Sequence, residues 1–417
     1  MTQLNITLSE EVLKELMLGN RDEAVTKLLE TVFDAVLKSE ASEQIGAKEY
    51  ERTEDRQTYR NGYRTRQLTT RVGSLTLHVP KFRDGTFSTE LFQNYERSEQ
   101  ALLLSLMEMV IQGVSTRKVA TITETLCGTS FSKSTVSKLC TRLDPVVKEF
   151  RQRPLTDSYP FVIVDAIYTK VREHGAVHSK GILIATAVNE EGQREVMGFE
   201  VGDSETYESW ANFFSQLKER GLKGVDLIVS DDHRGLVKAI REQFQGVSWQ
   251  RCQTHFSRNL LDKVSKQHRK HVHTRLKDLY NSPTLKEAYK RNQSLITELE
   301  SLAPKAATLL DESFVDITAV FALPEPYRKR LRTTNSIERL NAEIRRRERV
   351  IRIFPNEASI ERLIGALLME HHERWISGKA YFSMDTYRTE KEEAREETNI
   401  FWKWMNVNKI DTKKFSN

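Results

Sequence analysis

The spacing of apolar side chains changes within the first hundred residues. Up to residue 45, apolar side chains recur every three or four positions, which predicts two helices separated by Gly19 and Asn20. From residue 50 to residue 84, apolar and polar positions alternate, most clearly at Leu75, Leu77 and Val79, and glycines separate the runs. Alternation of this kind predicts short strands. The chain is therefore expected to begin with helices and to continue into a small strand region.

Helical spacing returns over residues 97–150 and predicts three helices, with a break at Gly128 and an end near Pro145. A glycine-containing turn between the second and third helices is typical of a helix-turn-helix unit. The third helix would begin after a serine cap at Ser132 or Ser134. The unit would bring two lysines near a DNA groove, although helix pairs in proteins that never bind DNA have the same pattern. These lysines are Lys133 and Lys138.

From residue 160 onward, continuous apolar runs alternate with amphipathic stretches. They follow the order β-β-β-α-β-α-β, and the strands include residues 161–170 and 225–232. Continuous apolar strands are typical of a sheet covered on both faces, so this part is predicted to be α/β. Residues 256–326 have helical spacing and no strand pattern, which predicts an all-helical block inserted after the last strand. A further helix is expected over residues 359–375.

Length and composition narrow the class of protein. The chain has 417 residues, of which 38% are hydrophobic and 29% charged, which suits a multidomain globular protein. No run approaches the ~20 apolar residues of a membrane span. Three cysteines are too few for a secreted disulfide scaffold. We therefore expect a protein of the reducing cytoplasm, without a membrane partner.

Positive charge is concentrated in particular segments, although the net charge is only +5. Arginines of the 50–84 region are interleaved with Tyr59 and Tyr63, and residues 329–352 hold nine Lys or Arg against three Glu. Such segments suit contact with a phosphate backbone. The alternative is a solvated helix that carries Glu–Arg pairs. The arginines predicted to contact DNA are Arg258, Arg332, Arg339, Arg345, Arg346 and Arg349.

Two aspartates follow apolar strands. Asp165 is predicted to close the first strand and Asp231 the fourth, and strand ends are where α/β proteins place catalytic groups. If these strands are neighbours, the two carboxylates converge and need a compensating charge such as Mg²⁺. Glu338 is the candidate third ligand of a two-metal site for phosphoryl transfer. The alternatives are a turn cap at either aspartate, and a capping box that pairs Asn335 with Glu338.

Four segments together resemble the Mutator-type transposases of bacterial insertion sequences. They are FVIVDAIYTKVRE around Asp165, LIVSDDHRGLVKAI around Asp231, RCQTHFSRNLL at Cys252 and His255, and RTTNSIERLNAEIRRR around Glu338. The resemblance covers nearly the whole chain and depends on the order and spacing of all four segments. It implies a ribonuclease-H-like fold with a helical insertion before the last acidic residue. It also implies that the three acids form a DDE catalytic triad that holds two Mg²⁺ or Mn²⁺ ions.

The function implied by the resemblance is that of a transposase of the bacterial cytoplasm, at the nucleoid. It would bind the terminal inverted repeats of its insertion sequence and catalyse metal-dependent DNA cleavage and strand transfer. Its partners would be the double-stranded DNA of the element ends and of the target, with at least a homodimer on the DNA. The family pattern favours Asp231 over Asp232 as the second acid. Two alternatives stay open: a ribonuclease-H-like nuclease or resolvase that cleaves without joining, and a DNA-binding regulator with an inert α/β unit.

Cys252 and His255 allow three interpretations. They could form half of a zinc site, completed by His268 and either His271 or His273. They could form a nucleophilic pair, although the sequence offers no third group to orient the histidine. The resemblance implies instead a Cys-x-x-His signature near the active site that positions the DNA end.

The whole chain is thus predicted to be a multidomain α/β protein whose ribonuclease-H-like mixed sheet follows a helical DNA-binding region. We expect seven parts in sequence. They are N-terminal helices suited to oligomerisation (1–45), a basic strand region for DNA contact (46–96), a helix-turn-helix-like region (97–155), the first part of the catalytic core (156–255), the helical insertion (256–328), the final core helices (329–376) and a C-terminal tail (377–417).

Overall fold

The computed structural model describes most of the chain and divides it into two compact units. The units are Met1–Arg142 and Leu143–Asn417. The first predicted helix, before Gly19, lies outside the described residues, as do Gly128 and most of the predicted C-terminal tail. The described residues are 21–49, 51, 53, 56–70, 72–83, 87–89, 100–127, 131–394 and 396.

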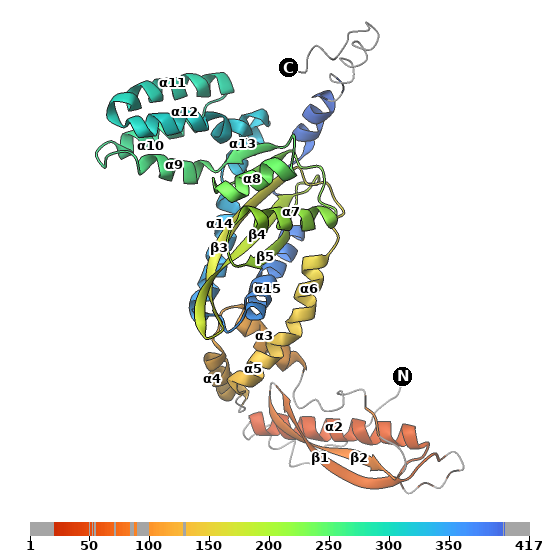
Figure 1. Cartoon of the computed structure of the whole chain (residues 1–417). Helices are drawn as coiled ribbons and strands as arrows, with labels where there is room; N and C mark the ends of the chain where they lie inside the picture. Colours follow the sequence, from red (N-terminus) through yellow and green to blue (C-terminus); the bar gives the residue numbers. More distant parts are fainter. Residues whose placement is uncertain are drawn as a thin grey trace. The chain divides into compact units, whose positions relative to one another are not determined.

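In the first unit, a helix packs on a two-stranded hairpin. Helix α2 (Arg21–Ile45) precedes the antiparallel strands β1 (Arg60–Thr70) and β2 (Gly73–Phe82) (Figure 1). Leu75 and Leu77 are fully buried in one core with side chains of α2. The predicted strands are therefore confirmed, and their alternating pattern has the expected cause, which is one strand face covered by a helix.

Three further helices of this unit share a core of their own. They are α3 (Gln100–Ile111), α4 (Thr116–Cys127) and α5 (Lys133–Cys140). Ser132 caps α5, because its side-chain oxygen accepts a hydrogen bond from the backbone nitrogen of Thr135 at 3.1 Å. The predicted cap is thus confirmed. Lys133 and Lys138 are exposed on α5.

The helical run of α5 ends just before Pro145, as expected, with a 3-10 turn over Thr141–Leu143, but a further helix that was not expected begins directly after it. Helix α6 (Asp144–Gln152) carries the proline in its first turn, where the missing N–H has no helical partner to lose. α6 belongs to the second unit. Its buried side chains Val147 and Phe150 pack against helix α15 (Glu357–Ile376).

The second unit is built on a five-stranded mixed sheet. The strands lie in the order β5-β4-β3-β6-β7, with β3, β4 and β5 antiparallel and β3, β6 and β7 parallel. The predicted order β-β-β-α-β-α-β is confirmed. The bounds of the strands are β3 Phe161–Glu173, β4 Ala176–Val188, β5 Arg194–Gly202, β6 Leu227–Ser230 and β7 Ser248–Arg251.

Helices cover both faces of this sheet, as its continuous apolar strands predict. On one face, α7 (Tyr207–Glu219) and α8 (Arg234–Gln243) pack on β3 through a core that includes Val162, Val164 and Trp210. On the other face lie α15 and α14 (Asn335–Ile351), which runs alongside β3 (Figure 1). The sheet is therefore the buried centre of the unit.

The segment between β7 and α14 is entirely helical, which confirms the predicted insertion. Its helices have a separate apolar core that includes Phe256, Leu276 and Leu310. Gln253 N donates to Arg332 O at 3.0 Å, so the two ends of the insertion meet. Its five α-helices are α9 Gln253–Leu261, α10 Arg269–Tyr280, α11 Leu285–Leu302, α12 Pro304–Thr318 and α13 Glu325–Leu331.

Among the described residues, every helix is too short or too polar to cross a bilayer.

Candidate active site

Asp165 and Asp231 stand level with each other on neighbouring parallel strands. β3 and β6 pair in register from Phe161 opposite Leu227 to Ile163 opposite Val229. Continuing this register by two residues brings Asp165 opposite Asp231, the residue that follows β6. The expected convergence of the two acids therefore has a direct cause in the strand pairing.

Asp165 does not close its strand, contrary to the prediction from the sequence. β3 continues to Glu173, because β4 remains paired with it up to Ala176. The residues after Asp165 alternate between buried and exposed, and the exposed positions are polar, so the apolar run ends before the strand does. Asp165 thus lies inside the sheet, where its carboxylate is largely withdrawn from water.

Burial and neighbouring charge act together on the Asp165 carboxylate. Its Oδ1 accepts a hydrogen bond from Ala166 N at 3.0 Å, and its Oδ2 accepts one from Asn341 Nδ2 at 2.8 Å. Burial first, and then the charge of Asp231, raise the pKa of Asp165 to about 7, and Glu338 acts in the same direction. The three acids are therefore within electrostatic range of one another, and their negative charge is incompletely compensated.

Asn341 is a site residue that the sequence reasoning missed. It lies three positions after Glu338 on α14, so the two side chains share a helix face. Its Nδ2 holds Asp165, whereas its buried Oδ1 has no hydrogen-bond partner among the described residues. The Glu-x-x-Asn spacing on the basic helix is the sequence signal that could have identified Asn341.

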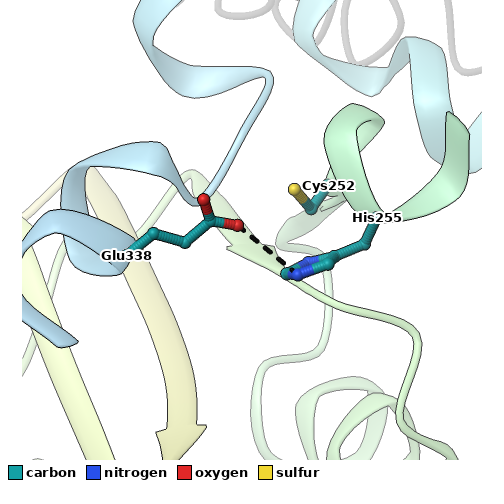
Figure 2. A group of neighbouring side chains, drawn as sticks. All are labelled: Cys252, His255 and Glu338. Atoms are coloured by element: carbon teal, nitrogen blue, oxygen red, sulfur yellow. Dashed lines mark ion pairs between the residues drawn. The ribbon is translucent and has the colours of Figure 1, made fainter. Parts of the chain in front are cut away.

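Glu338 points toward the Cys-x-x-His segment (Figure 2). Its Oε1 lies 3.4 Å from His255 Nε2 and 3.5 Å from the hydroxyl of Thr334. Thr334 is the N-cap of α14 but makes no side-chain cap bond, and Asn335 is already inside the helix. The alternative of a capping box between Asn335 and Glu338 is therefore wrong.

Cys252 and His255 form a polarised pair beside Glu338. Cys252 is fully buried, and its Sγ accepts hydrogen bonds from the backbone nitrogen and the hydroxyl of Thr334 at 3.4 and 3.3 Å. Burial raises the pKa of the Cys252 thiol, but the neighbouring His255 and the hydrogen bonds from Thr334 outweigh it and lower that pKa. The neighbouring Cys252 first, and then the charges of Glu338 and Asp165, raise the pKa of His255 to about 9. A protonated His255 thus places a positive charge beside the Glu338 carboxylate.

Two sets of side chains in this region could hold a metal. One is Cys252, His255 and Glu338, and the other is the three acids Asp165, Asp231 and Glu338. Among the described residues, the group of three or more potential ligands whose atoms all lie within 4.8 Å of one another is Cys252, His255 and Glu338. Asp165 and Asp231 are not part of that group, but the charges of both Glu338 and His255 act on the Asp165 carboxylate. The four-ligand zinc alternative is not assembled, because His271 pairs with Glu298 and His268 with Ser265.

Two further acids near Asp231 have identifiable partners. The Asp232 carboxylate forms an ion pair with the buried Arg251, with 2.9 Å between Oδ2 and Nη2. Glu205, whose place in the sequence suggests a cap or a surface charge, is instead largely buried and accepts hydrogen bonds from Trp210 Nε1 and the Tyr168 hydroxyl, each at 3.2 Å. Burial raises the pKa of Glu205, and the charge of Asp231 adds to this effect. Asp231 is the acid without such a structural partner in this set.

The arginines predicted to contact DNA have different surroundings. Arg332 donates to Tyr280 O at 3.0 Å and to Asn281 Oδ1 at 2.8 Å, so its guanidinium joins α13 to the end of α10. Arg346 pairs with Glu343 at 3.1 Å. The remaining four are exposed, one on α9 and three on α14: Arg258, Arg339, Arg345 and Arg349.

Comparison with known proteins gives the family of the chain. The family described as transposase, Mutator family, matches residues 1–378. The chain belongs to this family. As a Mutator-family member it is a DNA transposase, and a regulator with an inert α/β unit is excluded.

Relatives of this Mutator-family chain are transposases of insertion sequences. The transposase for insertion sequence element IS256 in transposon Tn4001 of Staphylococcus aureus is 45% identical and covers 92% of this chain and 100% of its own. The transposase for ISRM5 of Rhizobium meliloti is 43% identical, with coverage of 94% and 98%. The transposase for IS1081 of Mycobacterium tuberculosis is 38% identical, with coverage of 92% and 93%.

Among solved structures, the Drosophila P element transposase strand transfer complex aligns with 74% of this chain and 86% of its own. The sequence identity is 12% and the TM-score is 0.29, which is too low to support an argument about fold.

Proposed function

We propose that the chain is a DDE transposase that binds the terminal inverted repeats of its insertion sequence and catalyses cleavage and strand transfer at Asp165, Asp231 and Glu338. The observation that carries this proposal is the strand register that sets the two aspartates level, with α14 beside β3. The order of three antiparallel strands followed by two parallel ones supports a ribonuclease-H-like fold for the sheet.

The donor chemistry of the three acids fits Mg²⁺ or Mn²⁺. These cations prefer oxygen ligands, and they would offset both causes that raise the pKa of Asp165, its burial first and then the charge of Asp231. The buried, unpartnered Oδ1 of Asn341 is a further oxygen close to Asp165. When bound, such ions supply Lewis-acid activation of the attacking oxygen and stabilise the leaving oxygen.

The chain's own residues orient the acids and the DNA. Asn341 fixes one carboxylate oxygen of Asp165, and protonated His255 balances charge beside Glu338. In the first step water attacks a phosphodiester at the element end and releases a 3′-hydroxyl. In the second step that hydroxyl attacks a target phosphodiester, so one P–O bond forms as another breaks and no covalent enzyme intermediate is needed.

DNA would be held by basic side chains of both units. In the first unit, Lys133 and Lys138 project from α5 of a helix-turn-helix-like arrangement. In the second unit, the exposed arginines at 258, 339, 345 and 349 would contact phosphates, with Arg346 in addition. Joining two element ends requires two active sites, so we propose at least a homodimer on the DNA.

The test uses the variants Asp165→Asn, Asp231→Asn and Glu338→Gln in a strand-transfer assay. The substrate is a duplex that ends in the flanking inverted repeat with a pre-cleaved 3′-hydroxyl, in Mg²⁺ or Mn²⁺. Each variant is expected to lose joining by on the order of 10³-fold or more, with DNA binding by fluorescence anisotropy retained. Asp232→Asn is the matched control, because Asp232 pairs with Arg251, and it is expected to keep joining.

Two outcomes would contradict the proposal. Full joining by any one of the three variants would remove that residue from the catalytic set. Cleavage of an uncut end by the wild-type chain, without any joining of the pre-cleaved end, would favour the nuclease or resolvase alternative instead.

A further inference from the structure

Helix α14 ends in a strained turn. Arg352 has φ 65° and ψ −52°, and Ile353 N donates to Ile351 O at 2.8 Å across it. These values describe a γ-turn with positive φ, which is rare and costly for a residue with a side chain. Strain of this kind persists only where the surrounding structure fixes the backbone on both sides.

Hydrogen bonds on both sides of the turn fix its position. Arg352 N donates to Glu348 O at 2.8 Å, which closes α14. Immediately after the turn, Phe354 N donates to Lys170 O and Arg172 N donates to Phe354 O, each at 2.8 Å. Phe354 is fully buried. The turn is therefore held between the end of a helix and the protruding part of β3, and its shape is preorganised.

The turn exposes apolar side chains. Val350 is 43% exposed, and Ile351 and Ile353 are each 37% exposed, so three β-branched residues surround Arg352 at the surface. We call residues 350–353 the α14 turn. Elsewhere on α14 the apolar side chains Ile337, Leu340 and Ile344 are buried. Exposure of three neighbouring apolar side chains on a rigid backbone is unfavourable in water and suits a surface that receives them.

Positive charge surrounds this apolar surface. Arg345, Arg349 and Arg352 are exposed on the helix side, and Lys170 and Arg172 are exposed on the strand side. None of these five forms an ion pair with another described residue, whereas the neighbouring Arg346 and Arg347 pair with Glu343. An apolar centre within a field of unpaired cations is complementary to a polyanion that has an apolar interior, which is the chemistry of stacked bases between phosphate backbones.

We propose that the α14 turn is a wedge that enters double-stranded DNA and unstacks a base step, bending the duplex bound at the candidate active site. The inference rests on the proposed function only for the position of that DNA. Apolar side chains inserted between base steps kink DNA, and adjacent arginines contact the narrowed groove. Because the turn is already fixed by backbone hydrogen bonds, little conformational entropy remains to be lost on insertion.

The helix gives the position of the unstacked step. Glu338 and Ile351 are thirteen residues apart on α14. At a rise of about 1.5 Å per residue they are separated by about 20 Å. That length corresponds to about six base pairs at about 3.4 Å per base pair. The wedge is therefore expected to act about half a helical turn from the scissile phosphate.

The experiment scans 2-aminopurine, one position at a time, along a duplex that ends in the flanking inverted repeat. Binding of the wild-type chain is expected to raise the fluorescence several-fold at a step near the expected distance, since unstacking relieves the quenching of this base. The double variant Ile351→Ser/Ile353→Ser is expected to lose that rise while anisotropy still reports a complex. Val315→Ser, at a valine 76% exposed on α12, is the matched control and is expected to keep it.

Cleavage measured on the same duplexes separates the two proposals. Wild-type cleavage without a fluorescence rise at any position, or a rise that survives in the double serine variant, would overturn the wedge and leave the DDE proposal standing. If the fluorescence rise is lost in the double serine variant but the wild-type chain does not cleave, the wedge is supported and the catalytic assignment is contradicted. A serine variant that changes only the oligomeric state, or only binding to anionic phospholipid vesicles, would assign the turn to another partner and overturn the inference.

Discussion

Arg352 gives a prediction in which stability and DNA binding change in opposite directions. Glycine adopts positive φ without the steric cost that Arg352 carries, so Arg352→Gly is expected to raise the free energy of unfolding by about 1 kcal/mol. The same variant is expected to bind DNA several-fold more weakly, because one exposed cation is lost. Urea unfolding and fluorescence anisotropy measure the two effects.

Arg352→Ala is the matched control for this prediction. It removes the same charge but keeps a Cβ at positive φ, so DNA binding is expected to weaken without a gain in stability. If the glycine variant proved as stable as the alanine variant, the turn would not be strained in solution.

His372 gives a prediction about pH. Burial first, and then the charge of Arg153, lower the pKa of His372 to about 4. Its Nδ1 accepts a hydrogen bond from Val196 N at 3.3 Å, which needs a neutral ring. The folded state therefore binds fewer protons than the unfolded state, where a histidine titrates near about 6.5, and stability is lost as the pH falls from that value toward 4.

The expected loss is at most about 3 kcal/mol between pH 7.5 and pH 4. His372→Gln removes the titrating group, so the difference in unfolding free energy between the two chains should shrink as the pH falls. Parallel pH dependence of both chains in urea unfolding would contradict the assignment.

At the level of single residues, the sequence identifies a group when a pattern along the chain marks it. Asp165 and Asp231 follow apolar runs, and that position is sufficient to propose that they meet. Asn341 is marked only by its spacing from Glu338, and Glu205 by no pattern, because their roles come from contacts with Asp165 and with Trp210 that the packed helices create. The role of Arg332 also depends on distant contacts, since its hydrogen-bond partners Tyr280 and Asn281 lie 52 and 51 residues earlier, at the end of α10.

Among the elements, α15 begins with a reciprocal cap that can be tested. The Asn356 side chain accepts from Ser359 N at 2.9 Å, and the Ser359 hydroxyl is within 3.4 Å of Asn356 N. Asn356→Ala is expected to cost about 1 kcal/mol of unfolding free energy, and Asn356→Asp much less. Equal losses for the two variants in urea unfolding would show that the cap bond contributes little.

Periodicity along the sequence predicts where an element lies better than where it ends. The order of strands and helices in the second unit follows from the apolar spacing, because each element buries one face or both. The ends depend on pairing with distant segments, which is why β3 continues past its apolar run alongside β4. Pro145 shows the same limit, since a proline suits the first turn of α6 as well as the end of an earlier helix.

For the whole molecule, the boundary between Arg142 and Leu143 predicts which fragment folds. A chain of residues 143–417 keeps α6, whose Asp144 pairs with Arg362 at 2.6 Å. It is expected to unfold cooperatively, to bind DNA weakly and with strong salt dependence, and to lose preference for the inverted repeat. Chemical unfolding and anisotropy against repeat and unrelated duplexes test this.

A chain of residues 153–417 is the comparison, because it lacks α6. It is expected to be less stable, since Val147 and Phe150 no longer cover α15. Unchanged selectivity of the 143–417 fragment for the repeat would place end recognition in the second unit. It would contradict the prediction that the first unit recognises the repeat.

The closure of the helical insertion has a consequence for how this architecture can vary. Cys252 accepts hydrogen bonds from Thr334, and Gln253 N donates to Arg332 O, so the start and the end of the insertion are joined directly. This junction fixes the start of α14, and with it the position of Glu338, relative to the end of β7. Gln250 and Arg251 of β7 also bond to Ile317 and Ser313 of α12, so a change in the insertion is expected to leave the spacing of the three acids unchanged only where it spares α12 and this junction.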